Sequence, residues 1–390
     1  MRLLKAELAK IIAVNVLILL ALLLLAEGIG QGIALLRPSY EVLYLKPDRE
    51  LGWREVPGLH WTWAGFYWYA ADYSVKVQTN RTGFRDLERE YVKPAGVKRV
   101  AALGDSFIEA VQVPLEKTAT QLLERRLNAP QAQAAGPQKW EVLNFGISSY
   151  GVGQFLLTWE QEARRYSPDY VVVFVAKFIM DRTVQKYEQG RFQGTSAKQL
   201  WIRPTFGVDG DTLIREPARD FEEFARLQDS VIQNEFGGQR SRRRVSLVTL
   251  LYARRLHGDF DQWRQRHAAQ RPTALPHPDA HPEIDANMLA TNLKVLEELQ
   301  RQATAAHSVL VIVDASRYFG DDPSISTALQ DLCARGSSVY VPFYKDMQQA
   351  SAKGIPLQWS HDGHLSEAGN ALLADAIYRS LIQERRGDGH

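Results

Sequence analysis

The stretch "VKRVAALGDSFIEA", residues 97–110, carries the most informative pattern in this 390-residue chain. Its first seven residues are typical of a β-strand, and Ser106 follows where the apolar run stops, directly after Asp105. Serine is a favoured N-cap residue, so the simplest interpretation of Ser106 is that it caps the next helix. The alternative is a nucleophile, which requires a base, an acid and oxyanion donors from elsewhere in the chain.

Apolar runs of strand length recur along the chain, and helical patterns separate them. The four further runs are "WEVLNF" (140–145), "DYVVVFVA" (169–176), "SVLVIVD" (308–314) and "SVYVPF" (338–343), with helical patterns near 116–128, 152–166, 323–335 and 366–384. Continuously apolar strands separated by helices indicate a parallel sheet covered on both faces. The sequence therefore predicts an α/β fold, a three-layer doubly wound sandwich with a five-stranded parallel sheet and its site at the strand carboxyl ends.

The N-terminus carries a long apolar stretch, "IIAVNVLILLALLLLA" (11–26), close to the roughly 20 residues that span a bilayer. Arg2, Lys5 and Lys10 precede it, which predicts a cytoplasmic N-terminus. A cleaved signal peptide is the alternative, but the following residues lack a small-x-small cleavage site. We expect residues 1–37 to be an uncleaved transmembrane anchor that places the rest of the chain outside the cytoplasm.

Two segments do not fit the strand–helix alternation. Residues 38–96, the connecting segment, contain "HWTWAGFYWYAADY" (60–73), whose rings suit sugar stacking, a membrane-interface belt, or packing on the main domain. Residues 97–385 form the main domain, with an insertion at 182–306. The insertion has a hairpin pattern at 206–214 and helical patterns near 219–234, 245–266 and 284–306.

Composition excludes several classes of function. Lys and Arg number 47 and Asp and Glu 45, so the net charge of +2 indicates no nucleic-acid partner. The single cysteine, Cys333, excludes an internal disulfide and a multi-cysteine metal site. His277 and His281 lie in a Pro-rich linker rather than on a helix, which does not favour a metal site. We therefore expect neither a metal nor a cofactor.

The C-terminal stretch "WSHDGHLSEAGNALLADAI" (359–377) offers the base and the acid that Ser106 needs. His364 follows the fifth predicted strand, and Asp362 stands two residues before it. A neutral imidazole accepts the serine proton when a carboxylate fixes its tautomer and stabilises the resulting cation.

"GDSF" (104–107) and "DGHLSEAG" (362–369), on this strand pattern, resemble the SGNH (GDSL-type) esterase and acyltransferase superfamily over residues 97–180 and 308–385. "ELGWREVPG" (50–58) and "NRTGFRD" (80–86) resemble membrane-anchored bacterial members. The resemblance implies a flavodoxin-like SGNH fold with Ser106 as nucleophile, His364 as base and Asp362 as its partner. Most members place the acid three residues before the histidine, where this chain has His361; spacing by two is similar to relatives that O-acetylate polysaccharides.

The resemblance also implies the oxyanion hole. The second block matches "NFGISSYG" (144–151), and the family's glycine donor falls on Ser149, whose backbone N–H remains a donor if serine adopts the required backbone conformation. The third block matches "AKFIMDRT" (176–183) and puts Met180 where the family has an asparagine. Methionine donates no hydrogen bond, and losing one such donor typically costs about 10²–10³ in rate. Either Lys177 or Arg182 substitutes, or the enzyme is slow, or the hydrolase activity is lost.

These features lead to two hypotheses. The first is a single-pass, inner-membrane protein whose periplasmic domain is a serine esterase or O-acyltransferase, acting on ester groups of a cell-envelope glycan or lipid. The second is a catalytically inactive SGNH-like domain that serves as a binding or scaffold subunit of an envelope assembly. The sequence indicates no particular protein partner.

Overall fold

The computed structural model describes residues 2–36, 44–67, 70–130, 138–191, 198–218, 286–320 and 323–387. The chain divides into two compact units. One comprises residues 1–39, 67–70 and 232–272, and the other comprises residues 40–66, 71–231 and 273–390.

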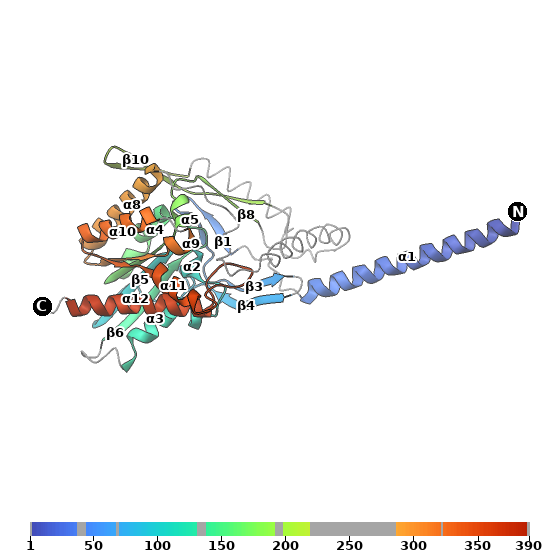
Figure 1. Ribbon diagram of the computed structural model, residues 1–390, viewed down its shortest axis with the longest axis horizontal. Helices are drawn as coiled ribbons and strands as arrows, with labels where there is room; N and C mark the ends of the chain where they lie inside the picture. The colour runs from blue at the N-terminus through green and yellow to red at the C-terminus, as the bar shows by residue number, and fades with distance from the viewer. Residues whose placement is uncertain are drawn as a thin grey trace. The chain divides into compact units, whose positions relative to one another are not determined.

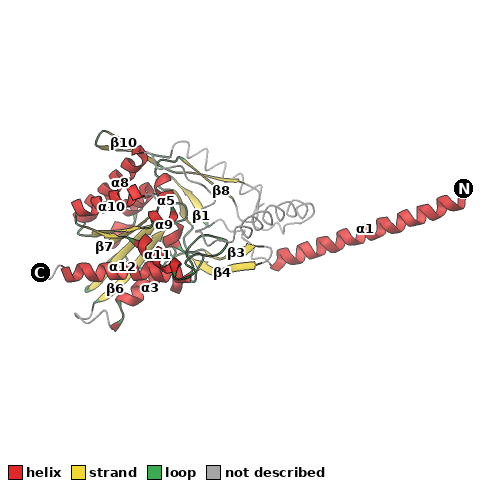
Figure 2. Ribbon diagram, viewed as in Figure 1, coloured by secondary structure: helices red, strands yellow, loops and turns green. Residues whose placement is uncertain are grey.

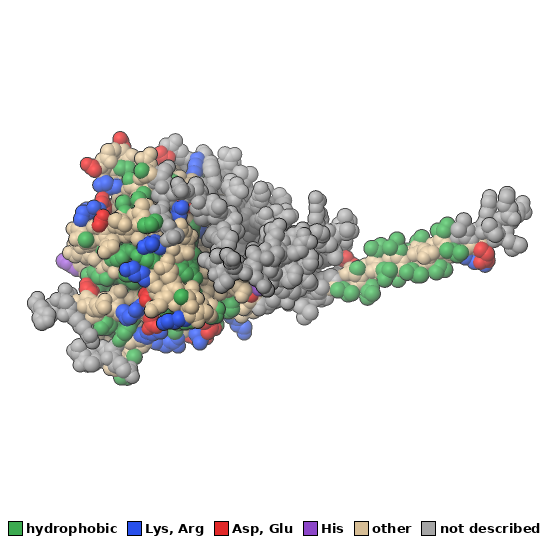
Figure 3. All heavy atoms as spheres, in the orientation of Figure 1, with side chains coloured by type: hydrophobic (Ala, Val, Ile, Leu, Met, Phe, Trp, Pro, Cys, Tyr) green, Lys and Arg blue, Asp and Glu red, His purple; other side chains and the backbone are tan. Residues whose placement is uncertain are grey.

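A single long helix, α1 (Arg2–Leu36), dominates the described part of the first unit. Its segment Lys10–Ile29 is 20 residues long, apolar enough to cross a membrane, and has none of its length buried against the protein. Figure 3 shows hydrophobic side chains along this helix. The predicted N-terminal apolar helix is therefore present. An anchor and a signal sequence share this length and composition, so the choice of an anchor stays a prediction.

A five-stranded parallel sheet forms the centre of the second unit (Figures 1 and 2). In spatial order the strands are β13 (Ser338–Val341), β12 (Val309–Asp314), β7 (Tyr170–Val175), β5 (Val97–Gly104) and β6 (Lys139–Gly146). Leu103 of β5 lies opposite Phe145 on one side and Val173 on the other. This is the order of a flavodoxin-like doubly wound sheet, in which the chain reverses direction between β5 and β7. The predicted five-stranded α/β fold is confirmed.

Helices cover both faces of this sheet (Figure 1). On one side α3 (Ala119–Leu127) packs against α12 (Glu367–Gly387). On the other side α8 contacts α4 and α10, whose bounds are Ala286–Ala305, Val152–Gln161 and Pro323–Arg335. Because both faces are covered, all six residues of β7 are buried, which explains its uninterrupted apolar sequence.

Short helices follow the strand ends. They are α2 (Ser106–Glu109) after β5, α5 (Lys177–Asp181) after β7 and α9 (Ser316–Phe319) after β12. A longer helix, α11 (Phe343–Ala352), follows β13, and two 3₁₀ turns occupy Leu115–Lys117 and Ala163–Tyr166. The short helices place polar side chains at the carboxyl ends of the strands, where ligands bind in such sheets.

The connecting segment forms two antiparallel pairs of strands. The strands are β1 (Leu45–Asp48) with β2 (Gly52–Glu55), and β3 (His60–Tyr67) with β4 (Ala70–Gln78). Tyr73 is buried in an apolar cluster with Val75, Val77 and Val111, against which the partly buried Trp61, Trp63 and Trp359 pack. For Trp61, Trp63 and Tyr73 the rings therefore pack on the main domain. The side chains of residues 64–71 lie outside the description.

The insertion contains two further antiparallel pairs in its described part. They are β8 (Tyr187–Arg191) with β9 (Lys198–Ile202), and β10 (Thr205–Asp209) with β11 (Thr212–Glu216). The second pair lies where the hairpin is predicted, and α8 lies where the last helix of the insertion is predicted. The helices predicted near 219–234 and 245–266 lie outside the described residues.

Candidate active site

Ser106 is the first residue of α2, and the N-cap is Asp105 instead. Asp105 has extended backbone, and its Oδ1 accepts the Phe107 N–H at 3.0 Å. Gly104 allows this tight turn, because a Cβ there would lie 2.2 Å from Ile108 Cγ1. The aspartate therefore satisfies the helix terminus, and the Ser106 hydroxyl is left for another partner.

That partner is His364. Its Nε2 lies 2.8 Å from Ser106 Oγ, and its Nδ1 contacts Asp362 Oδ1. The Phe107 ring packs beside the imidazole with 5.3 Å between ring centroids. Tyr73 of β4 donates its hydroxyl to the other oxygen of Asp362. The structure thus brings Ser106, His364 and Asp362 into one chain of hydrogen bonds. It adds Tyr73, which no sequence pattern had indicated.

The electrostatics of this chain favour an imidazole that attracts a proton. Burial acts to lower the pKa of His364, but the charge and hydrogen bond of Asp362 outweigh it, with Asp105 and Glu109 adding to the effect. The pKa of His364 is therefore raised above its usual 6.5. Burial acts to raise the pKa of Asp362, but His364 and the Tyr73 hydroxyl together hold it below its usual range. Asp362 consequently stays ionised while His364 exchanges a proton.

The loop that carries Asp362 is held by β4. Asp72 accepts the backbone N–H of His361 at 2.9 Å and contacts its ring Nδ1 at 2.8 Å. Trp359 packs on Tyr73 with 5.4 Å between ring centroids. His361, three residues before His364, thus attaches the loop to the connecting segment.

Ser149, in the loop after β6, is the second predicted backbone donor. Ser149, after β6, has a φ of +64°, the left-handed conformation that favours glycine. Among the described residues, no hydrogen bond uses the backbone N–H of Ser106 or Ser149. Two unused N–H groups at the strand ends are what an oxyanion hole requires.

Met180 lies one turn into α5, with its side chain fully buried in the hydrophobic core. Its carbonyl accepts a hydrogen bond from Asn292 Nδ2 at 2.9 Å. The pairing of Leu103 with Val173 brings Ser106 level with the start of α5, ahead of Met180. Met180 as the residue facing Ser106 stays a prediction, and its burial in the core does not favour it.

The two candidate cations differ in where they lie. Arg182 Nη1 donates to Asp105 Oδ2 at 2.9 Å and to the Tyr150 carbonyl at 3.3 Å, so Arg182 reaches the loop that carries Ser106. Lys177 instead lies over Gly320, where an added Cβ would be 3.0 Å from Lys177 Cδ. The contact of Arg182 with Asp105 holds the turn before Ser106.

The "NRTGFRD" motif anchors the connecting segment to the elements of the site. Gly83 has a φ of +81°, and a Cβ there would lie 2.7 Å from the Glu55 carbonyl. Arg85 is buried and donates to the carbonyls of Glu109, Ala110 and Val113 at and beyond the end of α2. The guanidinium thereby satisfies carbonyls that this short helix leaves without partners.

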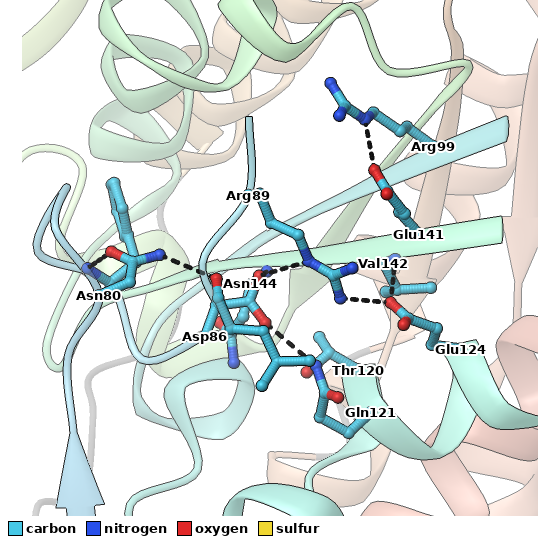
Figure 4. Close-up of polar contacts among 12 residues, drawn as sticks. Asn80, Asp86, Arg89, Arg99, Thr120, Gln121, Glu124, Glu141, Val142 and Asn144 are labelled. Atoms are coloured by element: carbon cyan, nitrogen blue, oxygen red, sulfur yellow. Dashed lines mark hydrogen bonds and ion pairs between the residues drawn. The ribbon is translucent and has the colours of Figure 1, made fainter. Parts of the chain in front are cut away.

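Asp86 continues this anchoring toward β6 and α3, as Figure 4 shows. Its carboxylate accepts the Asn144 backbone N–H at 3.1 Å and Gln121 Nε2 at 3.0 Å. Arg89 lies beside it and pairs with Glu124 of α3 at 2.5 Å. Burial raises the pKa of Asp86 to about 7. The motif therefore links β6 and the helices α2 and α3 through side chains of one short segment.

Comparison with known proteins gives structural similarity only. No protein-family model matches the chain, and no curated protein matches it. A lipase/acylhydrolase from Enterococcus faecalis is 14% identical, with a TM-score of 0.38 over 74% of this chain and 96% of that one. An acetylxylan esterase from Geobacillus stearothermophilus is 12% identical, with a TM-score of 0.37 over 73% and 94%. These values are too low to bear on function, which we argue from the chain's own geometry.

Proposed function

We propose that this chain is a membrane-anchored serine esterase or O-acyltransferase of the SGNH (GDSL-type) superfamily. The observation that carries the proposal is the 2.8 Å contact between His364 Nε2 and Ser106 Oγ, with Asp362 on the other ring nitrogen. The two sequence blocks that resemble the superfamily contain these three residues, which supports the same assignment.

In the proposed reaction Ser106 Oγ attacks the ester carbonyl carbon while its proton passes to His364 Nε2. The backbone N–H groups of Ser106 and Ser149 receive the negative oxygen of the tetrahedral intermediate. The intermediate collapses to an acyl-serine, and His364 returns the proton to the departing alcohol. Water or a second hydroxyl group, deprotonated by His364, then takes the acyl group and regenerates Ser106.

The substrate proposed is an ester-bearing glycan or lipid of the cell envelope, reached by a domain outside the cytoplasm. The apolar helix with Arg2, Lys5 and Lys10 before it supports this placement through the positive-inside rule. The resemblance to polysaccharide O-acetylating relatives, with acid and histidine spaced by two, supports acyl transfer alongside hydrolysis.

A second candidate function is an inactive SGNH-like scaffold subunit. Met180, at the position predicted for the family's asparagine, is the observation that favours it, because no side-chain donor is then expected for the oxyanion. A fluorophosphonate probe distinguishes the two on the full-length chain in detergent, since it labels only an activated serine. Labelling of the wild type that is lost in Ser106→Ala supports the enzyme. Wild-type protein that neither labels nor hydrolyses p-nitrophenyl acetate supports the scaffold.

A further inference from the structure

Two buried carboxyl groups lie beside the proposed oxyanion hole, and the proposed reaction does not use them. Glu109 of α2 and Glu55 of β2 are both 0% exposed. Burial raises the pKa of Glu109 above its usual range. Burial, and then the charge of Glu109, raises the pKa of Glu55 well above its usual range.

Glu109 uses its acceptor capacity on Ser148, the residue before Ser149. Ser148 Oγ donates to Glu109 Oε2 at 2.5 Å. The carbonyl of Ser148 accepts the Trp53 Nε1–H at 3.0 Å. One polar group of Ser148 is thus held by α2 and the other by β2.

The next residue needs such support. A non-glycine residue is strained in the left-handed conformation, and Ser149 has a φ of +64°. On its other side, the Tyr150 hydroxyl donates to the Trp53 carbonyl. Both neighbours of Ser149 are therefore fixed to the connecting segment, and the strained residue lies between two anchored ones.

We propose that Glu109 is a positioning residue of the oxyanion hole, which acts through Ser148 to aim the Ser149 backbone N–H. The inference rests on the proposed function and deepens it. In the proposed reaction two backbone N–H groups, those of Ser106 and Ser149, receive the oxyanion. A misdirected Ser149 N–H would then weaken the transition state directly.

The test removes the Ser148 hydroxyl and leaves Ser106, His364 and Asp362 in place. In the full-length chain in detergent, Ser148→Ala should lower kcat for p-nitrophenyl acetate by about tenfold, with KM changed by less than about twofold. Inhibition by a trifluoromethyl ketone, whose bound hemiketal carries an oxyanion, should weaken by the same factor as kcat. Ser148→Thr keeps the hydroxyl and should restore most of kcat.

A second variant and a control separate positioning from general loosening. Glu109→Met should lower kcat like Ser148→Ala, and the two changes together should cost no more than Glu109→Met alone. Ser308→Ala is the matched control, because its hydroxyl donates to the Pro168 carbonyl at 2.6 Å, where β12 begins at the opposite edge of the sheet. It should keep the wild-type kcat.

Three outcomes would contradict the positioning role of Glu109. Wild-type kcat in Ser148→Ala, in a wild type that labels with fluorophosphonate, overturns the positioning role and leaves the proposed function intact. An equal loss of kcat in Ser308→Ala also overturns the positioning role, because the effect is then not specific to the loop that carries Ser148 and Ser149. A wild type that neither labels nor turns over substrate overturns the proposed function and this inference with it.

Discussion

The carboxyl edge of the sheet and the connecting segment contribute to the candidate site in different ways. The sheet edge supplies the groups proposed to react, namely Ser106 after β5, Ser149 after β6 and His364 beyond β13. All of them lie on loops or short helices that directly follow buried strands or precede a helix. Such a position exposes a polar group at the end of a rigid element, which suits chemistry.

The connecting segment supplies none of these groups and instead holds the loops that carry them. Tyr73 binds Asp362, Trp53 binds the Ser148 carbonyl and Arg85 binds the end of α2. Each contact fixes a different loop of the sheet edge. A segment with no reactive group of its own can therefore set the geometry of a site through its hydrogen bonds.

The largest expected effect tests the sheet edge. Ser106→Ala and His364→Ala should each lower kcat/KM by about 10⁴-fold or more, because each removes an indispensable member of the relay. The double variant should lose little more than either single one, since the two residues act as a unit. The measurement is ester turnover by the purified variants. Thermal unfolding like that of the wild type shows that each variant is folded. Comparable turnover in wild type and Ser106→Ala would exclude Ser106 as the nucleophile.

The next effect tests the connecting segment through stability. Arg85→Met should lower the free energy of unfolding by about 3–5 kcal/mol, because it leaves buried carbonyls and the Glu109 carboxylate without their cation. Arg54→Met is the matched control, since Arg54 pairs with Asp48 at 2.5 Å with 36% of its side chain exposed, and should cost about 1 kcal/mol or less. Equal losses in chemical denaturation would remove the special role given to Arg85.

A smaller effect joins the two regions. Tyr73→Phe should lower kcat by about tenfold, because Asp362 loses the hydroxyl that orients it. His364 must be neutral to accept a proton, so kcat/KM should fall with decreasing pH around a midpoint above 6.5. Without the Tyr73 hydroxyl the Asp362 charge acts more strongly on the imidazolium, and this midpoint should move to higher pH.

Tyr318→Phe controls for loss of a phenol, since within the described part of the chain the Tyr318 hydroxyl bonds only to the exposed Ser351 Oγ, at 2.9 Å. A pH profile of kcat/KM for both variants measures the difference. An unmoved acid limb in Tyr73→Phe would show that β4 supports the loop without tuning the histidine.

The smallest effect concerns Ser149, the residue with a positive φ in the loop after β6. Ser149→Gly should raise the free energy of unfolding by about 0.5–1 kcal/mol, because glycine adopts a positive φ at no steric cost. Ser167→Gly, at a φ of +49° after the second 3₁₀ turn, should gain a similar amount. Urea denaturation compares the two. A loss of stability in Ser149→Gly alone would mean that the serine side chain makes a contact worth more than the strain.

The fold was predictable because its signal is local. Each strand of the parallel sheet is an apolar run that is buried on both faces, and each long helix shows its own periodicity. The candidate site residues could be predicted for the same reason. Ser106 directly follows a strand, and Asp362 and His364 lie close together before a helix. Short motifs at strand ends can be found without knowledge of the packing.

The residue predicted at the third oxyanion position, Met180, was harder to place from the sequence. Nothing in the sequence around Met180 shows where the helix after β7 begins. In the structure α5 begins at Lys177, and the Met180 side chain lies in the core. Helices of four or five residues, such as α2 and α5, carry too few positions for a periodic pattern. The side-chain directions at the strand ends therefore depend on contacts with neighbouring elements.

Sequence patterns were enough to predict the α/β architecture, the apolar N-terminal helix and the pairing of a strand-end serine with a downstream Asp-x-His. The folded chain was needed to show that Tyr73 contacts Asp362, that Asp72 contacts His361 and that Glu109 contacts Ser148. These contacts join residues far apart in the chain, and their geometry follows from how separate elements pack. Local propensity and periodicity carry no information about such pairs, because burial and hydrogen bonding choose the partner only once the fold has formed.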